Sequence, residues 1–328
     1  MLVSGSPQRV LVTGATGFVG RALIPALVRE GHAVRATTRA LSRARQGNGA
    51  EWVRADLAVA ADVEAALTGI DAAYYLVHGM GGAHEGYRAA ELEAATLFAA
   101  AAGRAGVKRI IYLGGVAPAG KASEHLASRL DVGGALRRGP VPTLELRASL
   151  VIGNGSASWK IVRDLAMRLP AMLLPKWTES KTSPIALEDV LVALTRGLRV
   201  PLTASAWFDV PGPEVLSGRD ILLQIAALQG RQLPSLRVPL LSPSLSSWWL
   251  KLVTGVDFAL ARELVLGFTG DLLPRDDRYW SLIDHRPAVT FEKAARVALA
   301  TEGPTPGVSG LFIDLEEAIV HRLGTPRR

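Results

Sequence analysis

The segment that most constrains the fold is a glycine-rich turn near the N-terminus, Thr13-Gly14-Ala15-Thr16-Gly17-Phe18-Val19-Gly20. An apolar run, residues 10–13, precedes this turn, and aliphatic residues at helical spacing follow it. This context predicts a strand, a tight turn and a helix. In such a segment the first glycine allows the turn, the second lets a ligand approach the backbone, and the third lets the helix pack on the strand. Because a helix N-terminus also offers free N–H groups, the segment predicts a site for a dinucleotide pyrophosphate. We expect the cofactor-binding residues here to be Gly14, Thr16, Gly17, Phe18, Val19 and Gly20.

Short β-branched segments alternate with helical segments over the first 155 residues. The pattern predicts strands at residues 10–13, 33–38, 51–54, 72–77, 109–113 and 143–148. It predicts helices at residues 19–30, 62–67, 86–102 and 123–138, with Gly31 and Gly103 at helix C-termini. This alternation is typical of an α/β fold with a doubly wound parallel sheet, the Rossmann fold.

The second half of the chain is rich in tryptophan and proline and is less periodic. Residues 184–196 predict a strand followed by a helix, residues 207–210 a strand, and residues 217–228 a helix that begins at a serine cap. We expect residues 1–210 to form an NAD(P)-binding Rossmann domain and residues 211–328 a smaller C-terminal domain that caps the substrate, with residues 156–180 contributing to the cap. The tryptophans are expected in the core of this cap; alternatively, Trp159 or Trp177 walls an apolar substrate pocket.

Composition narrows the chemistry. The chain of 328 residues has no cysteine, which excludes disulfides, thiolate zinc sites, cysteine-ligated iron–sulfur clusters and a cysteine nucleophile. The net charge is +7, but basic and acidic residues alternate along the chain. A dispersed charge of this kind disfavours nucleic-acid binding and favours a small-molecule partner. The oligomeric state stays open.

No segment predicts a membrane span or a secretory signal. Residues 246–268 are the most apolar stretch, but Lys251, Asp257, Arg262 and Glu263 interrupt it. We expect a packed amphipathic helix pair there, and the alternative is a peripheral membrane contact through Trp248 and Trp249. The N-terminal segment before the first apolar run is short and polar and does not resemble a secretory signal. The expected location is therefore cytoplasmic.

The end of the second predicted strand indicates which dinucleotide binds. The segment Arg35-Ala36-Thr37-Thr38-Arg39 lacks the Asp or Glu that would accept hydrogen bonds from an NAD ribose. Arg39 is instead expected to meet a 2′-phosphate, with Arg35 and Arg43 as possible helpers. The sequence therefore favours NADP(H) over NAD(H). We expect Asp56 and Leu57, just after the third strand, to lie beside the adenine.

Several further segments resemble a known family. Residues 73–80 (AYYLVHGM), 109–115 (RIIYLGG) and 125–129 (HLASR) resemble the NmrA-like, atypical short-chain dehydrogenase/reductases. Residues 145–148 and 151–156 resemble a poorly characterised bacterial group of NAD(P)H-binding oxidoreductases in that superfamily. The resemblance implies a Rossmann fold and a nicotinamide cofactor but no particular substrate. It also implies that strand-end residues line the cofactor, namely Leu76, Val77, His78 and Gly114.

The predicted active site departs from the pattern of that superfamily. Members that reduce carbonyls use a Tyr-x-x-x-Lys pair and a Ser at the end of the fifth strand. Here His125 and Arg129 stand at the spacing of the pair, and Gly114-Gly115 replaces the Ser. We expect Arg129 to hold the nicotinamide ribose and His125, with an ordinary pKa of about 6.5, to donate or relay a proton. The alternative is that both are ordinary polar residues of a helix.

Three residues are candidates for substrate contact. His78 follows the fourth strand, Tyr87 begins the next helix and Arg147 ends the sixth strand, all at the edge where ligands bind in such sheets. His78 and His84 flank a glycine-rich loop suited to a gate over the substrate. Without a third ligand, this histidine pair does not predict a metal site.

The sequence leaves two functions open. The first is an NADPH-dependent reductase of a small, apolar carbonyl, enone or quinone-like compound. The second is a non-catalytic NADP(H)-binding protein, either a redox sensor or an assembly or accessory factor. The missing Tyr and Ser favour the second, whereas the cap and the His125/Arg129 pair favour the first.

Overall fold

A parallel sheet of seven strands forms the centre of the molecule. The computed structural model describes residues 6–77, 86–120, 122–168, 172–231, 235–238 and 270–302. The sheet has the order β11-β6-β5-β4-β1-β2-β3, and every neighbouring pair is parallel. The strands are β1 (Arg9–Val12), β2 (Ala33–Thr38), β3 (Ala50–Arg54), β4 (Ala72–Tyr75), β5 (Arg109–Gly115), β6 (Thr143–Ala148) and β11 (Ala206–Asp209). The predicted doubly wound α/β sheet is confirmed, and its strand order reverses between β1 and β4, where such folds bind ligands.

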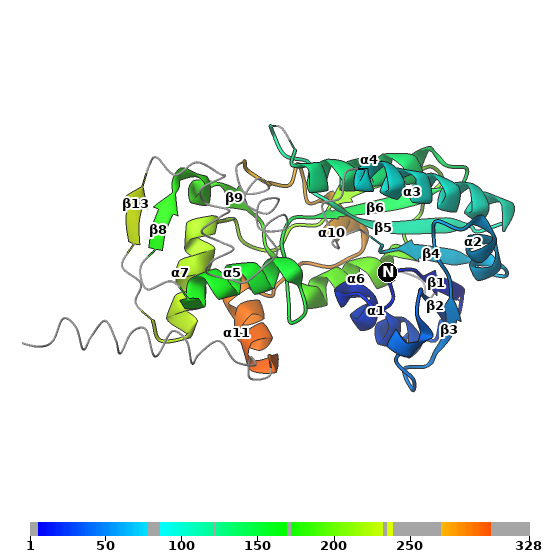
Figure 1. Ribbon diagram of the computed structural model, residues 1–328, viewed down its shortest axis with the longest axis horizontal. Coiled ribbons are helices and arrows are strands. Elements are labelled where there is room, and N and C mark those ends of the chain that lie inside the picture. The colour runs from blue at the N-terminus through cyan, green and yellow to red at the C-terminus, as the bar shows by residue number, and fades with distance from the viewer. Residues whose placement is uncertain are drawn as a thin grey trace, which may run out of the picture.

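Helices cover both faces of the sheet (Figure 1). One face carries α1 (Phe18–Arg29) and α6 (Leu187–Gly197), and the other carries α2 (Ala60–Leu67), α3 (Tyr87–Arg104) and α4 (Glu124–Arg138). The alternation along β1 shows why both layers form. Val10 and Val12 are buried toward α1 and α6, whereas Leu11 is buried toward α2 and α3.

Of the two glycines predicted at helix C-termini, one follows a helix end and the other lies inside a helix. Gly31 follows α1 with φ +86°, which confirms the expected helix end. The prediction for Gly103 is wrong, because α3 continues to Arg104 and Gly106 follows its end with φ +74°. A Cβ at Gly103 would lie 2.4 Å from the Pro140 Cγ. Close packing, rather than a helix end, therefore requires glycine at residue 103.

A second hydrophobic core lies at the other end of the molecule (Figure 1). It is built by α5 (Ala157–Arg168), α7 (Gly218–Leu228) and α11 (Phe291–Thr301). Ser217 caps α7 in a capping box with Asp220, as the sequence predicts. Trp159 is fully buried in this core, so the alternative that its ring walls a substrate pocket is wrong. The Trp177 side chain, Trp248 and Trp249 lie outside what the structure describes.

Short strands and 3₁₀ helices complete the described elements. β7 (Val151–Ile152) pairs with β10 (Ile185–Ala186), β9 (Lys181–Thr182) with β12 (Leu216–Ser217), and β8 (Met172–Pro175) with β13 (Ser235–Val238). The 3₁₀ helices are η1 (Leu41–Arg43) and η2 (Lys176–Glu179). Within the described ranges, the structure contains no helix whose length and apolar character would let it cross a membrane.

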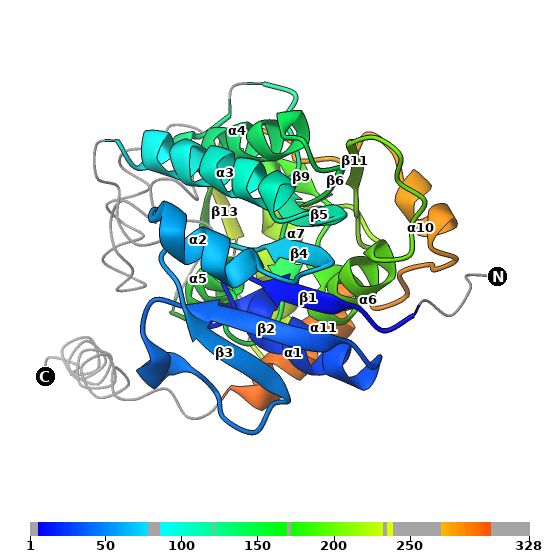
Figure 2. The same ribbon diagram turned by 90° about the vertical axis from the view of Figure 1, so that its right-hand side faces the viewer.

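The chain returns to the sheet after building part of the second core. Helix α10 (Arg278–Leu282) lies beside β11 (Figure 2), and its Tyr279 and Trp280 are buried in the core on the α1 and α6 side. The Tyr279 hydroxyl donates to the Ala193 carbonyl of α6 at 2.7 Å. Residues 278–283, which lie after the expected domain boundary at residue 210, therefore belong to the first hydrophobic core.

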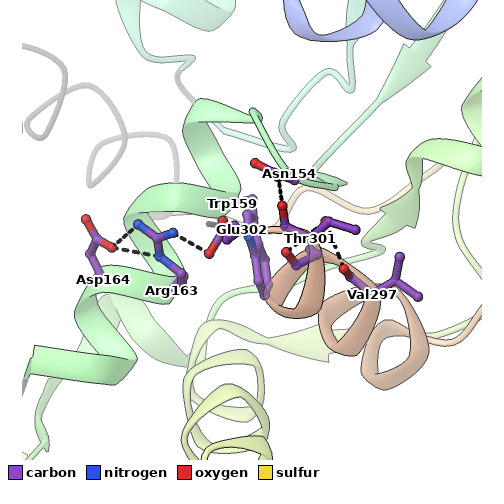
Figure 3. A network of polar contacts seen from close by, with 8 residues as sticks. Asn154, Trp159, Arg163, Asp164, Val297, Thr301 and Glu302 are labelled. Atoms are coloured by element: carbon purple, nitrogen blue, oxygen red, sulfur yellow. Dashed lines mark hydrogen bonds and ion pairs between the residues drawn. The ribbon is translucent and has the colours of Figure 1, made fainter. Parts of the chain in front are cut away.

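Polar side chains fasten the end of α11 to the segment around α5 (Figure 3). The Asn154 amide donates to the Thr301 carbonyl at 2.7 Å, and the Trp159 indole N–H donates to Glu302 at 2.9 Å. Arg163 also pairs with Glu302. Because the glycines on either side of Asn154 pack against Phe18 at the start of α1, this network joins the second core to the glycine-rich turn.

Candidate functional site

The glycine-rich turn has the shape that a pyrophosphate requires. Gly14 has φ +63°, and its carbonyl accepts a hydrogen bond from the Gly17 N–H at 2.9 Å. A Cβ at Gly20 would lie 2.5 Å from that same carbonyl oxygen, so α1 can approach the turn only with glycine there. A Cβ at Gly17 would instead meet just one atom of the described residues within 4 Å, the Gly14 carbonyl oxygen at 3.1 Å. Among the described residues, the backbone at Gly17 is therefore free of the close contacts that surround Gly14 and Gly20, so a ligand could approach it.

The start of α1 is prepared for an anion. Gly17 is the N-cap residue, no side chain of the described residues caps the helix, and its first turn contains no acidic residue. The first N–H groups and the positive end of the helix dipole are therefore available to phosphate. Phe18 and Val19 follow: Phe18 packs on Gly153 and Gly155, and Val19 packs against the sheet core. The Thr16 carbonyl accepts from the Arg21 guanidinium at 2.5 Å. The residues of the turn thus fit a dinucleotide.

The ends of β1 and β4 are joined beside this turn. The Thr13 hydroxyl donates to the Tyr74 carbonyl at 3.0 Å and accepts from the Leu76 N–H at 3.1 Å. Leu76 and Val77 therefore stand at the point where the strand order reverses, and Val77 is exposed. His78 and His84 lie outside the described residues.

The end of β2 presents one basic residue to solvent. Arg39 is exposed, and within the described part of the chain it makes no ion pair and no side-chain hydrogen bond. Arg35, expected as an additional contact to the 2′-phosphate, has other partners. Its guanidinium donates to Glu51 at 3.1 Å and to the carbonyls of Ala66 and Thr68 at 3.0 and 2.9 Å. Arg43 lies in η1 and is exposed.

The turn after β3 is held by its own polar groups. The Asp56 carboxylate accepts the Ala58 N–H at 3.1 Å, and the Asp56 N–H donates to Asp62 at 2.9 Å. Leu57 is buried in the core beside α2. Contact of Asp56 and Leu57 with an adenine stays a prediction.

Arg129 lies beside the end of β5. One guanidinium nitrogen donates to the Leu113 carbonyl at 3.0 Å, and the Tyr112 hydroxyl donates to the Arg129 carbonyl at 2.9 Å. Arg129 Nε is buried without a hydrogen-bond partner among the described residues. A Cβ at Gly115 would lie 2.6 Å from the Leu126 side chain. Glycine at residue 115 therefore allows α4 to pack closely on β5.

His125 is neutral at neutral pH. Burial, followed by the positive charge of Arg129, lowers the pKa of His125 to about 4, although the Glu91 carboxylate acts in the opposite direction. This corrects the expectation of an ordinary pKa near 6.5, since an imidazolium is scarce at neutral pH. The neutral ring still offers one N–H donor and one acceptor nitrogen.

Arg147 belongs to a buried ion cluster rather than an open rim. Its Nε donates to Glu145 at 2.9 Å, and Arg137 donates to the other Glu145 oxygen at 2.7 Å. The Arg147 guanidinium carbon also lies 4.3 Å from the Trp207 ring centroid. The sequence interpretation missed Glu145, which is fully buried; the signal was an acidic residue inside the apolar strand TLELRA. Gly114 faces this carboxylate.

Tyr87 is the first residue of α3, directly after Gly86 with φ +93°. Its side chain is half-buried. Substrate contact by Tyr87 stays a prediction.

Comparison with known proteins agrees with this site. Residues 14–163 match the family described as NAD(P)H-binding. Over 107 residues the chain is 34% identical to a 2-alkyl-3-oxoalkanoate reductase of Stenotrophomonas maltophilia (strain K279a), covering 32% of each protein. Over 55 residues it is 51% identical to a chloroplastic divinyl chlorophyllide a 8-vinyl-reductase of Oryza sativa subsp. indica, covering 17% of this chain and 14% of that protein. The chain thus spans about a third or less of the length of these curated relatives.

A solved structure extends the comparison over the second core. A UDP-glucuronic acid 4-epimerase from Bacillus cereus in complex with NAD shares 15% identity and a TM-score of 0.66, covering 89% of this chain and 97% of that one. The likeness shows that this chain has the same fold as that structure, a Rossmann sheet with the glycine-rich turn at the start of α1. The match of residues 14–163 to the NAD(P)H-binding family agrees with the cofactor class that the sequence motifs predicted. The narrower likeness to NmrA-like proteins stays a prediction.

Proposed function

We propose that the protein is an NADPH-dependent reductase of a small, apolar carbonyl, enone or quinone-like compound. The observation that carries the proposal is the pairing of two features. The turn at Gly17 leads into the N-terminus of α1, which no side chain of the described residues caps. At the end of β5, on the same edge of the sheet, α4 begins with His125 and Arg129. The reductase names of both curated relatives support the same class of reaction.

Each residue has a stated task in this proposal. The turn and the N-terminus of α1 bind the pyrophosphate, Arg39 binds the 2′-phosphate, and Arg129 holds the nicotinamide ribose. NADPH supplies a hydride when it is bound. His125, as a neutral ring, donates a hydrogen bond to the substrate oxygen and takes part in its protonation.

The reductase proposal predicts that the purified protein oxidises NADPH with some members of a panel of quinones, enones, aldehydes and imines. His125→Ala is expected to lower the rate about 100-fold while leaving NADPH affinity unchanged, because general acid–base groups contribute about that much. Arg129→Ala is expected to weaken both NADPH binding and turnover. The measurement is the loss of NADPH absorbance, with nucleotide affinity measured by fluorescence titration.

A sensor or accessory protein is the second candidate, and specific observations favour it. Glycines occupy the usual Ser position, and the pKa of His125 is far below neutrality. Tight NADPH binding, no turnover on any compound of the panel, and indifference to His125→Ala would establish this function in place of the reductase.

NADPH preference is a separate prediction. Arg39→Ala is expected to weaken NADPH binding about tenfold or more, because a charge-assisted hydrogen bond to phosphate contributes about 1.5–3 kcal/mol. NADH affinity should not change. Arg104→Ala, which removes an exposed arginine from α3, is the matched control. Equal affinities of the wild-type protein for NADPH and NADH would contradict the preference.

A further inference from the structure

The interface between α3 and α4 changes character along its length. Away from the candidate site it is apolar, with Phe98 and Ala102 of α3 and Val132 and Leu136 of α4 buried in one core. At the site end it is polar. Arg88 pairs with Asp131 at 2.6 Å in an exposed position, and Glu91 meets Ser128 one helical turn further along α3.

Glu91 is held between the two helices. It is half-buried, and its carboxylate accepts a hydrogen bond from the hydroxyl of Ser128, which is fully buried. Ser128 lies three residues after His125 and directly before Arg129, so His125 and Ser128 are neighbours on one face of α4. Removing a carboxylate partly from water costs free energy, and an apolar contact between the two helices at this position would avoid that cost. The rest of this interface shows that apolar contacts suffice to pack α3 on α4.

Glu91 also acts electrostatically on the site. Its carboxylate favours the protonated form of His125, against burial and the charge of Arg129 on α4. The other titratable groups near this charge are Tyr112 of β5 and Tyr75 of β4, and burial raises the pKa of both tyrosines, that of Tyr112 to about 12. Among these groups, Glu91 is the one suited to exchange protons with water, since its carboxyl is only half-buried whereas both tyrosines are buried.

We propose, on the basis of the reductase function, that Glu91 is the outer member of a proton relay in which it passes protons from solvent to the ring of His125. In the reduction of a carbonyl, a C–H bond forms with the hydride, the π bond breaks, and its electron pair moves to oxygen. That oxygen takes a proton from one ring nitrogen of His125. The other ring nitrogen gains a proton from the protonated Glu91 side chain, and water reprotonates Glu91. A flip of the ring after the product leaves returns the N–H to the substrate side. One solvent proton is consumed per turnover, and His125 stays neutral.

The test compares Glu91→Gln with Glu93→Gln, which removes the same charge from an exposed position two residues away. Glu91→Gln is expected to lower NADPH oxidation about 10- to 100-fold and to raise the solvent deuterium isotope effect, because proton transfer becomes limiting. NADPH affinity should be unchanged. Glu91→Asp, which keeps the carboxylate, should recover part of the rate. The ¹⁵N NMR signals of the His125 ring should shift in Glu91→Gln and not in Glu93→Gln.

The outcomes separate this inference from the reductase function. If Glu91→Gln behaves like Glu93→Gln in rate, isotope effect and ring-nitrogen spectrum, Glu91 is not part of a relay. If the wild-type protein binds NADPH and reduces nothing, the reductase function fails, and with it the relay as a catalytic device. The spectrum still reports whether Glu91 and His125 are coupled in that case. Should Glu91→Gln fail to fold, Ser128→Ala, which removes the hydrogen bond to the Glu91 carboxylate, is compared with Glu93→Gln in the same three measurements.

Discussion

Replacing Gly14 with alanine is expected to abolish NADPH binding and to destabilise the protein by about 2–4 kcal/mol. Two costs combine at this position. The backbone has φ +63°, which disfavours any residue with a Cβ, and the added Cβ would lie 2.5 Å from the Leu76 carbonyl oxygen. Because that oxygen belongs to the backbone after β4, relief would require the ends of β1 and β4 to separate. Denaturant unfolding and a fluorescence titration with NADPH measure the two effects.

Gly31→Ala is the matched control for the turn. Gly31 also has a positive φ, +86°, but no atom of the described residues lies within 4 Å of an added Cβ. The Gly31→Ala substitution should therefore lower the free energy of unfolding by about 1 kcal/mol, from the backbone conformation alone, and leave NADPH affinity unchanged. Equal losses of stability and affinity in the two variants would contradict the role assigned to the Leu76 contact.

Glu145→Ala is expected to cost about 3–5 kcal/mol of stability, the range seen when one member of a buried ion pair is removed. The Glu145 side chain is fully buried, and it binds the guanidinium groups of Arg147 at 2.9 Å and Arg137 at 2.7 Å. Without Glu145, Arg147 would keep a charge in a site where its side chain is only 8% exposed. The free energy of unfolding in denaturant is the measurement.

An exposed pair provides the comparison for Glu145. Glu292 and Arg296 form an ion pair at 2.7 Å on the surface of α11, one helical turn apart. Glu292→Ala should change stability by less than about 0.5 kcal/mol, because water solvates both charges once the pair is broken. If Glu145→Ala were equally mild, the cluster would not stabilise the edge of the sheet as described.

The sequence predicted the sheet and the turn because both depend on local patterns. Alternating apolar segments, the glycine spacing and the Ser217 cap act over a few residues, and all of these elements lie where expected, within about two residues. Gly103 was misassigned because its requirement for glycine comes from Pro140, which is distant in the sequence. The return of α10 to the first core is equally non-local, and the sequence pattern gave no sign of it.

The site shows the same division. Arg39 and Arg129 lie as the spacing predicted, exposed after β2 and beside β5. The sequence offered Arg35 as an additional contact to the 2′-phosphate and Arg147 as a substrate contact, and it could not show that they pair with Glu51 and Glu145. The sequence by itself determined the Rossmann sheet, the glycine turn and the positions of the candidate residues, because periodicity and spacing are local. Only the tertiary structure decided which charges are paired, how far burial lowers the pKa of His125, and that Glu91 of α3 meets Ser128 of α4, because these depend on contacts between elements.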